Sequence, residues 1–326
     1  MFLYPRDIIN LLPVSKTLYK TNQIINWKKL FKILFSNSPT YIDFPCNSNA
    51  VMNLAKPNCY ECNTLTTSFH IKKMDRICLD CYNKDEENKD EENKDIVPII
   101  GQWFFKSMPD FIISDNIKPG KYKNYTVTPD IWQAVNDAKF GSVICIMKDI
   151  IIKEKFIDRQ FIFKIPVRLY GAKNKQTGNF YKISLPQSSI CFRQSSIIEN
   201  LIIISGPEKY GPYNPIDPEN AYPCLQIDNF QNKQNNSIIQ NCIITARVGT
   251  GILINKPNIV ANIHNNTITE CSYAGICLVK SISHLTYITN NNIIDNGSWA
   301  VQTKIQKDAD NIMIMNHCTN NELIIR

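Results

Sequence analysis

The chain lacks an apolar run near its start that is long enough for a signal peptide or a membrane span, because Pro5, Arg6 and Asp7 interrupt it at once. It also lacks a dense run of Lys and Arg interleaved with aromatic residues, although its formal net charge is +7. These absences argue against membrane insertion and against nucleic-acid binding. We therefore expect an intracellular, cytoplasmic protein that binds neither a membrane nor a nucleic acid.

The twelve cysteines occur in two settings. Some lie in Ile-rich runs, where a free thiol packs as a small apolar group. The others include two Cys-x-x-Cys pairs, which provide the four soft thiolates that tetrahedral Zn²⁺ requires and leave no position open for water. The sequence therefore predicts free thiols and one structural zinc site, whose ligands are Cys59, Cys62, Cys78 and Cys81.

One charged segment divides the chain. Residues 84–95 repeat Lys-Asp-Glu-Glu-Asn twice without an apolar side chain, which predicts a flexible linker. Ahead of it, apolar residues at helical spacing predict a helical module over residues 1–36, and the zinc module occupies residues 37–83. The third part covers residues 96–326.

A repeat organises this third part. Asn241, Asn266, Asn291 and Asn316 are each 25 residues apart, and each lies in an Ile-rich stretch. The residue three before each Asn is apolar, and so is the residue two after it, so we expect both to point inward and stack. The residues two positions after each Asn are Ile243, Ile268, Ile293 and Cys318. A second strand follows in each coil, at 251–254, 275–278 and 300–303. The pattern predicts a mainly β fold, namely a right-handed parallel β-helix of about 25 residues per coil.

The Asn of each coil suits a bend, since Asn tolerates left-handed backbone angles and its amide can bond to a stacked Asn. A helix near residues 129–139 precedes the first coils, with Thr128 as its N-cap, Pro129 at its first position, Asp130 in its first turn and Gly141 beyond its end. We expect this helix to cover the open end of the stacked strands.

One interval departs from the period, because Asn200 and Asn241 are 41 residues apart. The additional residues fall within 206–223, a stretch rich in Pro and Tyr. An insertion in a solenoid forms a loop on one face, often the binding face. We therefore expect an unknown protein or glycan to contact this loop, with Tyr210, Tyr213 and Tyr222 as the candidate residues.

Two stretches resemble known families. Pro5-Arg6-Asp7-Ile8-Ile9, Val14-Ser15-Lys16 and Trp27-Lys28-Lys29-Leu30-Phe31 resemble the later part of an F-box, whose opening helix has no counterpart here. This resemblance implies a Skp1-type adaptor as partner, with Trp27 and Leu30 in the contact. Ile131-Trp132-Gln133-Ala134-Val135, Gly141-Ser142-Val143-Ile144 and Leu169-Tyr170-Gly171 resemble the entry into pectate-lyase-like β-helices. The combination resembles substrate-receptor subunits of ubiquitin ligases and implies a non-enzymatic receptor.

Two alternatives stay open. A carbohydrate-active lyase or hydrolase needs paired carboxylates or an acidic calcium site, and Glu270 and Asp295, one coil apart, are the candidate catalytic residues. Acids at a turn are also ordinary turn formers, and the paired Asp-Asp and Gly-His-Gly patterns of polygalacturonases are absent. The other alternative is a structural or binding solenoid of a large DNA virus, present in the host cytoplasm or the virion, which the Ile-, Asn- and Lys-rich composition suggests.

Overall fold

The computed structural model describes residues 58–64, 66, 68–70, 75–78, 81, 96–98, 105, 108–152, 160–206, 223–228, 235–256, 259–280, 286–303, 305–319 and 321. The chain divides into two compact units, Met1–Ser107 and Met108–Arg326. The predicted helical module 1–36 and the predicted linker 84–95 lie outside the described residues. Across the described ranges, no helix is long and apolar enough to cross a membrane.

The described strands of the first unit form one small antiparallel sheet. They are β1 (Ser68–His70), β2 (Asp75–Arg76) and β3 (Ile96–Pro98), in the spatial order β2-β1-β3. β3 follows the predicted linker in sequence, yet it pairs with β1 and so belongs to the first unit. The units therefore divide after residue 107, whereas the sequence analysis began the third part at residue 96.

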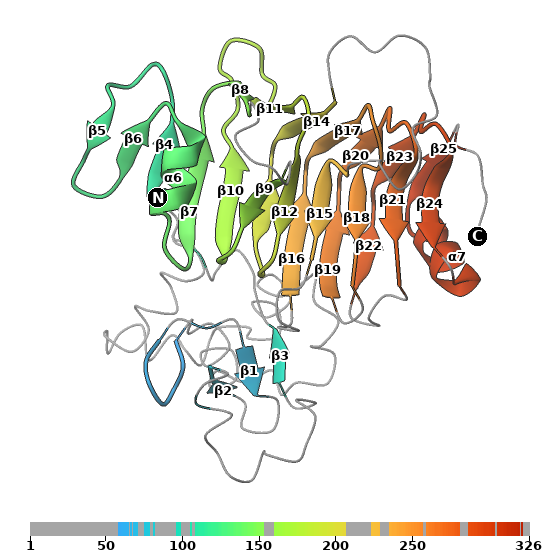
Figure 1. The fold of residues 1–326 in the computed structure, drawn as a ribbon, viewed down its shortest axis with the longest axis horizontal. Helices are drawn as coiled ribbons and strands as arrows, with labels where there is room; N and C mark the ends of the chain where they lie inside the picture. The colour runs from blue at the N-terminus through green and yellow to red at the C-terminus, as the bar shows by residue number, and fades with distance from the viewer. Residues whose placement is uncertain are drawn as a thin grey trace, which may run out of the picture. The chain divides into compact units, whose positions relative to one another are not determined.

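The second unit consists mainly of parallel strands in three sheets (Figure 1). The nine-stranded sheet contains, in spatial order, β22 (Tyr287–Thr289), β19 (Ile259–His264), β16 (Asn235–Gln240), β13 (Ile197–Glu199), β10 (Val167–Gly171), β7 (Ser142–Ile146), β4 (Phe111–Ile113), β6 (Thr126–Thr128) and β5 (Gly120–Lys121). The seven-stranded sheet contains β25 (His317–Thr319), β23 (Asn292–Ile294), β20 (Thr267–Thr269), β17 (Ile243–Ala246), β14 (Ile202–Ser205), β11 (Lys182–Leu185) and β8 (Ile150–Ile151). The six-stranded sheet contains β24 (Trp299–Thr303), β21 (Ala274–Leu278), β18 (Ile252–Ile254), β15 (Leu225–Ile227), β12 (Ser189–Phe192) and β9 (Gln160–Phe163).

Consecutive strands pass from one sheet to the next. From β7 onward, each strand pairs in parallel with the strand three places later in the chain, up to β24, while β25 pairs with β23. One coil therefore contributes one strand to each sheet, and the sheets grow together as coils are added. We call this arrangement the three-sheet stack. The strands predicted at 251–254, 275–278 and 300–303 are confirmed as β18, β21 and β24.

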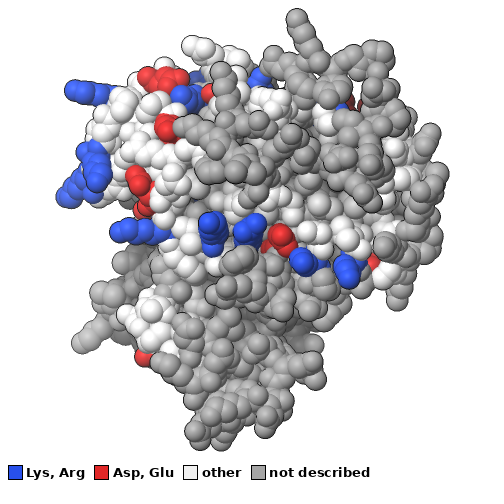
Figure 2. Space-filling view, in the orientation of Figure 1, with Lys and Arg blue, Asp and Glu red and all other residues white. Residues whose placement is uncertain are grey.

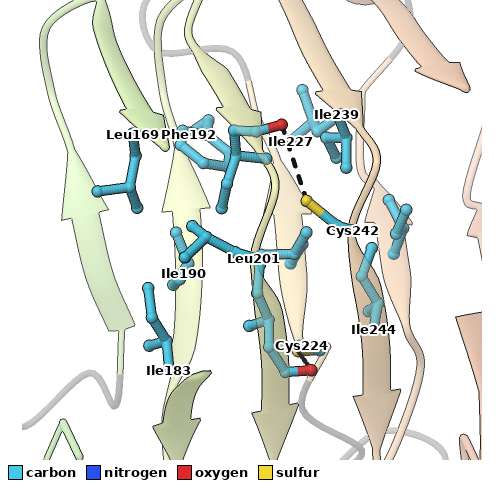
Figure 3. Packing of buried hydrophobic residues seen from close by; sticks show 14 of the residues in the cluster. Leu169, Ile183, Ile190, Phe192, Leu201, Cys224, Ile227, Ile239, Cys242 and Ile244 are labelled. Atoms are coloured by element: carbon cyan, nitrogen blue, oxygen red, sulfur yellow. Dashed lines mark hydrogen bonds between the residues drawn. The ribbon is translucent and has the colours of Figure 1, made fainter. Parts of the chain in front are cut away.

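Ile side chains fill the space that the three sheets enclose (Figure 3). Leu169 of β10, Ile183 of β11 and Ile190 of β12 point toward one another from three different sheets, and each is fully buried. Short strands of β-branched residues suit this arrangement, because each coil can bury its apolar face only against the coils beside it.

The strand register corrects the predicted period by one residue. Asn241 in one coil is equivalent to Asn265 in the next, so the coil that begins at Asn241 has 24 residues. The coil that begins at Asn265 has 25. The inward column is accordingly Ile203, Ile244, Ile268, Ile293 and Cys318. Ile243, predicted to point inward, is 40% exposed, while Ile244 is fully buried. A slip of one residue exchanges the two faces of a strand.

The single predicted Asn column is in fact two neighbouring columns. Asn200, Asn241, Asn265 and Asn290 have positive φ near 56°, in the left-handed region that forms the bend. Asn266, Asn291 and Asn316 follow in a separate column of hydrogen-bonded amides. The Nδ2 of Asn266 donates to the Oδ1 of Asn291 at 2.9 Å, and Asn291 donates likewise to Asn316 at 2.8 Å. Bending and stacking, which the sequence analysis assigned to one residue, thus belong to two.

A helix packs on the core at the first coils. α6 (Ile131–Asp137) confirms the helix predicted near 129–139, and its Trp132 ring meets that of Phe161 edge-on at 4.4 Å. The N-cap is Asp130, not Thr128, because the Asp130 carboxylate accepts the backbone N–H of Trp132 at 2.8 Å. Thr128 instead accepts the N–H of Asp130, which positions the cap.

A second helix, which the sequence analysis missed, packs at the last coil. α7 (Gln306–Ile314) includes Met313, which lies three residues before Asn316 and was expected to point inward in the repeat. Its Ile312 is buried in the core, whereas Ile314 is 81% exposed. The repeat resumes only at Asn316, whose amide continues the hydrogen-bonded column. Helices therefore cover apolar side chains at both the first and the last described coils.

Candidate metal centre and a buried polar column

The first Cys-x-x-Cys pair lies in a tight turn. The backbone N–H of Cys59 donates to the carbonyl of Thr64 at 2.7 Å, and the N–H of Asn63 donates to the carbonyl of Cys59 at 2.9 Å. Asn63 has a φ of 58°, which Asn tolerates better than most residues. The Nδ2 of Asn58 also donates to the carbonyl of Asn63 at 2.8 Å. These bonds hold Cys59 and Cys62 on one side of the turn.

The second pair lies beside a small apolar cluster. Ile77 is fully buried and packs with Cys59 and Cys81, while Cys78 lies at the edge of the cluster. The backbone N–H of Cys81 donates to the Sγ of Cys78 at 3.4 Å. Burial of Ile77 thus brings the second pair against the first.

The four thiols have a geometry that fits one metal ion. All four Sγ atoms lie within 4.8 Å of one another, and the Sγ atoms of Cys62 and Cys78 are 3.6 Å apart. A tetrahedral ion with metal–sulfur bonds of about 2.3 Å separates its sulfur ligands by about 3.8 Å. The cluster predicted from the sequence could therefore hold a metal ion without large movement of the chain.

The pKa values of the thiols differ within this cluster. Hydrogen bonds with the side chain and the backbone of Thr64 lower the pKa of Cys62 to about 6. Hydrogen bonding to Cys78 raises the pKa of Cys81, and burial raises that of Cys78. Four thiolates this close repel one another, so a bound cation is what allows them to ionise together. Metal binding at this site must therefore release protons.

The residues predicted to contact partners lie outside the described part of the chain. They are Trp27, Leu30, Tyr210, Tyr213 and Tyr222. The adaptor contact and the loop contact therefore stay predictions.

Glu270 and Asp295, the predicted catalytic pair, occupy equivalent turns. Each directly follows a strand of the seven-stranded sheet, and Thr269 and Ile294, which precede them, are register partners. Both acids are exposed, and both have φ near 55°. Left-handed, exposed positions at a bend are typical of residues that form the turn.

A buried polar column on the nine-stranded sheet was missed by the sequence analysis. Glu199, Gln240 and His264 are register partners on β13, β16 and β19, on the face opposite the Ile core, and they are 2%, 5% and 9% exposed. Glu199 Oε1 lies 2.5 Å from the Arg168 guanidinium, and the Nε2 of Gln240 donates to the other carboxylate oxygen. Burial lowers the pKa of His264 and keeps its imidazole neutral at pH 7.

Charge-assisted hydrogen bonds join Glu199 of this column to Arg168 and to Gln240. Removing one partner would leave a buried charge uncompensated, which is strongly destabilising. The signal in the sequence was a Glu in the Ile-rich stretch before Asn200, but its partners lie 31 and 41 residues away and only the strand register brings them together.

Comparisons of the chain with protein-family models, with curated proteins and with solved structures found no match.

Proposed function

We propose that this chain is a non-enzymatic, F-box-type substrate-receptor subunit of a ubiquitin ligase, whose three-sheet stack is a right-handed parallel β-helix that binds a partner. The single observation that carries the scaffold role is the strand order, in which every coil supplies one parallel strand to each sheet. Crossovers between parallel strands are right-handed in about 98% of cases, which supports the handedness. Such a stack offers a rigid surface on which loops and side chains can recognise another molecule.

The four-cysteine cluster supports a structural zinc ion in this proposal. Zinc favours four thiolates in a closed tetrahedral site, and such a site contributes to folding and not to catalysis. Cys59 and Cys81 are buried against Ile77, so a bound ion would connect the two Cys-x-x-Cys pairs around this small cluster.

The ligase role rests on the resemblance of residues 1–36 to the later part of an F-box. The exposed, left-handed positions of Glu270 and Asp295 support a turn role for the only predicted catalytic pair and so favour a receptor over an enzyme. The partner of the first 36 residues would be a Skp1-type adaptor.

A capture experiment tests the ligase role. The tagged full chain is expected to recover an adaptor of this type from host lysate, and substitutions Trp27→Ala and Leu30→Ala together should reduce recovery at least tenfold. Substitutions Lys28→Ala and Lys29→Ala, which change charge but keep the apolar side chains, are the matched control. Recovery of no adaptor, or equal loss in both double variants, would remove the ligase role and leave the zinc and scaffold proposals untouched.

A further inference from the structure

One turn of the three-sheet stack collects charged residues that are far apart in the sequence. It follows the strands of the six-stranded sheet, whose last residues Phe163, Phe192, Ile227, Ile254 and Leu278 are register partners from coil to coil. Lys164, Arg193 and Asp228 come directly after three of them, and Lys256 and Lys280 come two residues after the others. The turn therefore carries one charged side chain in each of five successive coils.

We call Lys164, Arg193, Lys256 and Lys280 the basic row. Lys164, Lys256 and Lys280 are exposed, and no described carboxylate forms an ion pair with any of the three. Asp228 lies at the centre, with two cations on each side along the stack. Figure 2 shows blue side chains in a line across this view of the molecule, with red between them.

The length of the row matches a short extended peptide. Neighbouring strands lie about 4.8 Å apart, so the four steps from β9 to β21 span about 19 Å. An extended peptide advances about 3.3 Å per residue, so about six residues cover this distance. Side chains at both ends of such a peptide could reach cations while its centre lies over Asp228.

We propose that the basic row binds an acidic peptide that carries a basic residue at its centre. Two features favour a peptide over a nucleic acid. Asp228 interrupts the positive charge, which a continuous phosphate backbone would meet as repulsion. The described aromatic residues beside the charged ones, Phe163 and Phe192, are each 1% exposed, so neither ring offers a face on which a base could stack.

The basic row contains no residue of 206–223, and the proposal holds whether or not residues 1–36 bind an adaptor. The partner would carry the acidic segment in an exposed, extended stretch. Opposite charges across the surface would set the register of the peptide and accelerate its encounter with the stack, and both effects weaken with salt.

Fluorescence anisotropy with the full chain tests the proposal. The probe is a labelled synthetic heptapeptide in which one lysine lies between two runs of three acidic residues. Binding should weaken about tenfold in the Lys256→Glu, Lys280→Glu variant, since exposed ion pairs contribute modestly and reversal adds repulsion. The Lys118→Glu, Lys123→Glu variant has the same net charge change at exposed sites outside the row, and it should bind within about twofold of the unmodified chain.

Two further probes decide what the row recognises. A heptapeptide of acids alone should bind less tightly than the probe with the central lysine, and Asp228→Asn should reverse that order. Absence of probe binding to the unmodified chain, or equal weakening in both double variants, would overturn the proposal. A single-stranded oligonucleotide that binds more tightly than either peptide, and loses binding in the Lys256→Glu, Lys280→Glu variant, would reassign the row to nucleic acid.

Discussion

Replacement of Asn291 by Ala tests whether the amide column stabilises the stack. The side chain of Asn291 is 1% exposed. Its Oδ1 accepts the backbone N–H and the side-chain N–H of Asn266, both at 2.9 Å. Its Nδ2 donates to the carbonyl of Ile263 at 2.9 Å and to Oδ1 of Asn316 at 2.8 Å. One side chain thus connects three successive coils.

The cost of the substitution follows from the groups that it leaves without partners. Loss of the Asn291 amide would free the backbone N–H of Asn266, one N–H of the Asn266 side chain and the carbonyl of Ile263, all in a buried setting. Each buried polar group that loses its partner costs about 1–3 kcal/mol, with part of the cost recovered when neighbours or water adjust. We therefore expect Asn291→Ala to lower the free energy of unfolding by about 3–5 kcal/mol.

Urea denaturation followed by circular dichroism measures this loss. Asn292→Ala is the matched control, because Asn292 is the next residue and its side chain is exposed. The control should change the free energy of unfolding by less than about 0.5 kcal/mol. Equal losses in the two variants would refute the role assigned to the column.

Four other outcomes follow from the structure. Ile244→Ala should cost about 2–5 kcal/mol in urea denaturation and Ile243→Ala less than about 1 kcal/mol, since only the first is buried; the reverse order would restore the register predicted from the sequence. Metal-stripped protein should take up about one zinc per chain and release it on acidification, because protons compete for thiolates; elemental analysis that finds no uptake would remove the site. Gly275→Ala should lower the free energy of unfolding by about 1–3 kcal/mol, because the added Cβ would lie 2.5 Å from Ile293 Cγ2 and 2.8 Å from the Ala300 carbonyl oxygen. An unchanged urea midpoint would contradict this packing. Burial lowers the folded-state pKa of His264 below its ordinary 6.5, so the unfolded chain binds the proton more readily and the free energy of unfolding falls as pH drops through 6.5. His264→Asn should reduce this pH dependence, measured as the urea midpoint at several pH values. An unchanged dependence of the midpoint on pH would count against the role of His264.

Local pattern predicted the strands well but misjudged their alignment. The runs at 251–254, 275–278 and 300–303 are strands, and the helix near 129–139 is present as α6. The equal spacing of Asn241, Asn266, Asn291 and Asn316 suggested one column, because adjacent Asn residues at 265–266 and 290–291 allow two alignments. Only the hydrogen-bonded register distinguishes them, and it places Asn241 with Asn265.

The four-cysteine cluster was predictable because its chemistry is local. Two short Cys-x-x-Cys turns each place two thiols together, and the spacing between the turns permits them to meet. The polar column of Glu199, Gln240 and His264, together with the Arg168 that pairs with Glu199, was not predictable in this way. These residues are dispersed over four strands, and a lone Glu or His in an Ile-rich segment has no distinctive local signal.

The sequence by itself determined which stretches form most of the strands and which thiols meet, since backbone preference and short spacings decide these features. Tertiary structure alone decided which face of each strand is buried, because that depends on pairing between coils, and a shift of one residue exchanges the faces. It also decided which dispersed charges become neighbours. The Arg168–Glu199 pair and the basic row both exist because parallel coils place residues from distant parts of the chain at the same turn or on the same face.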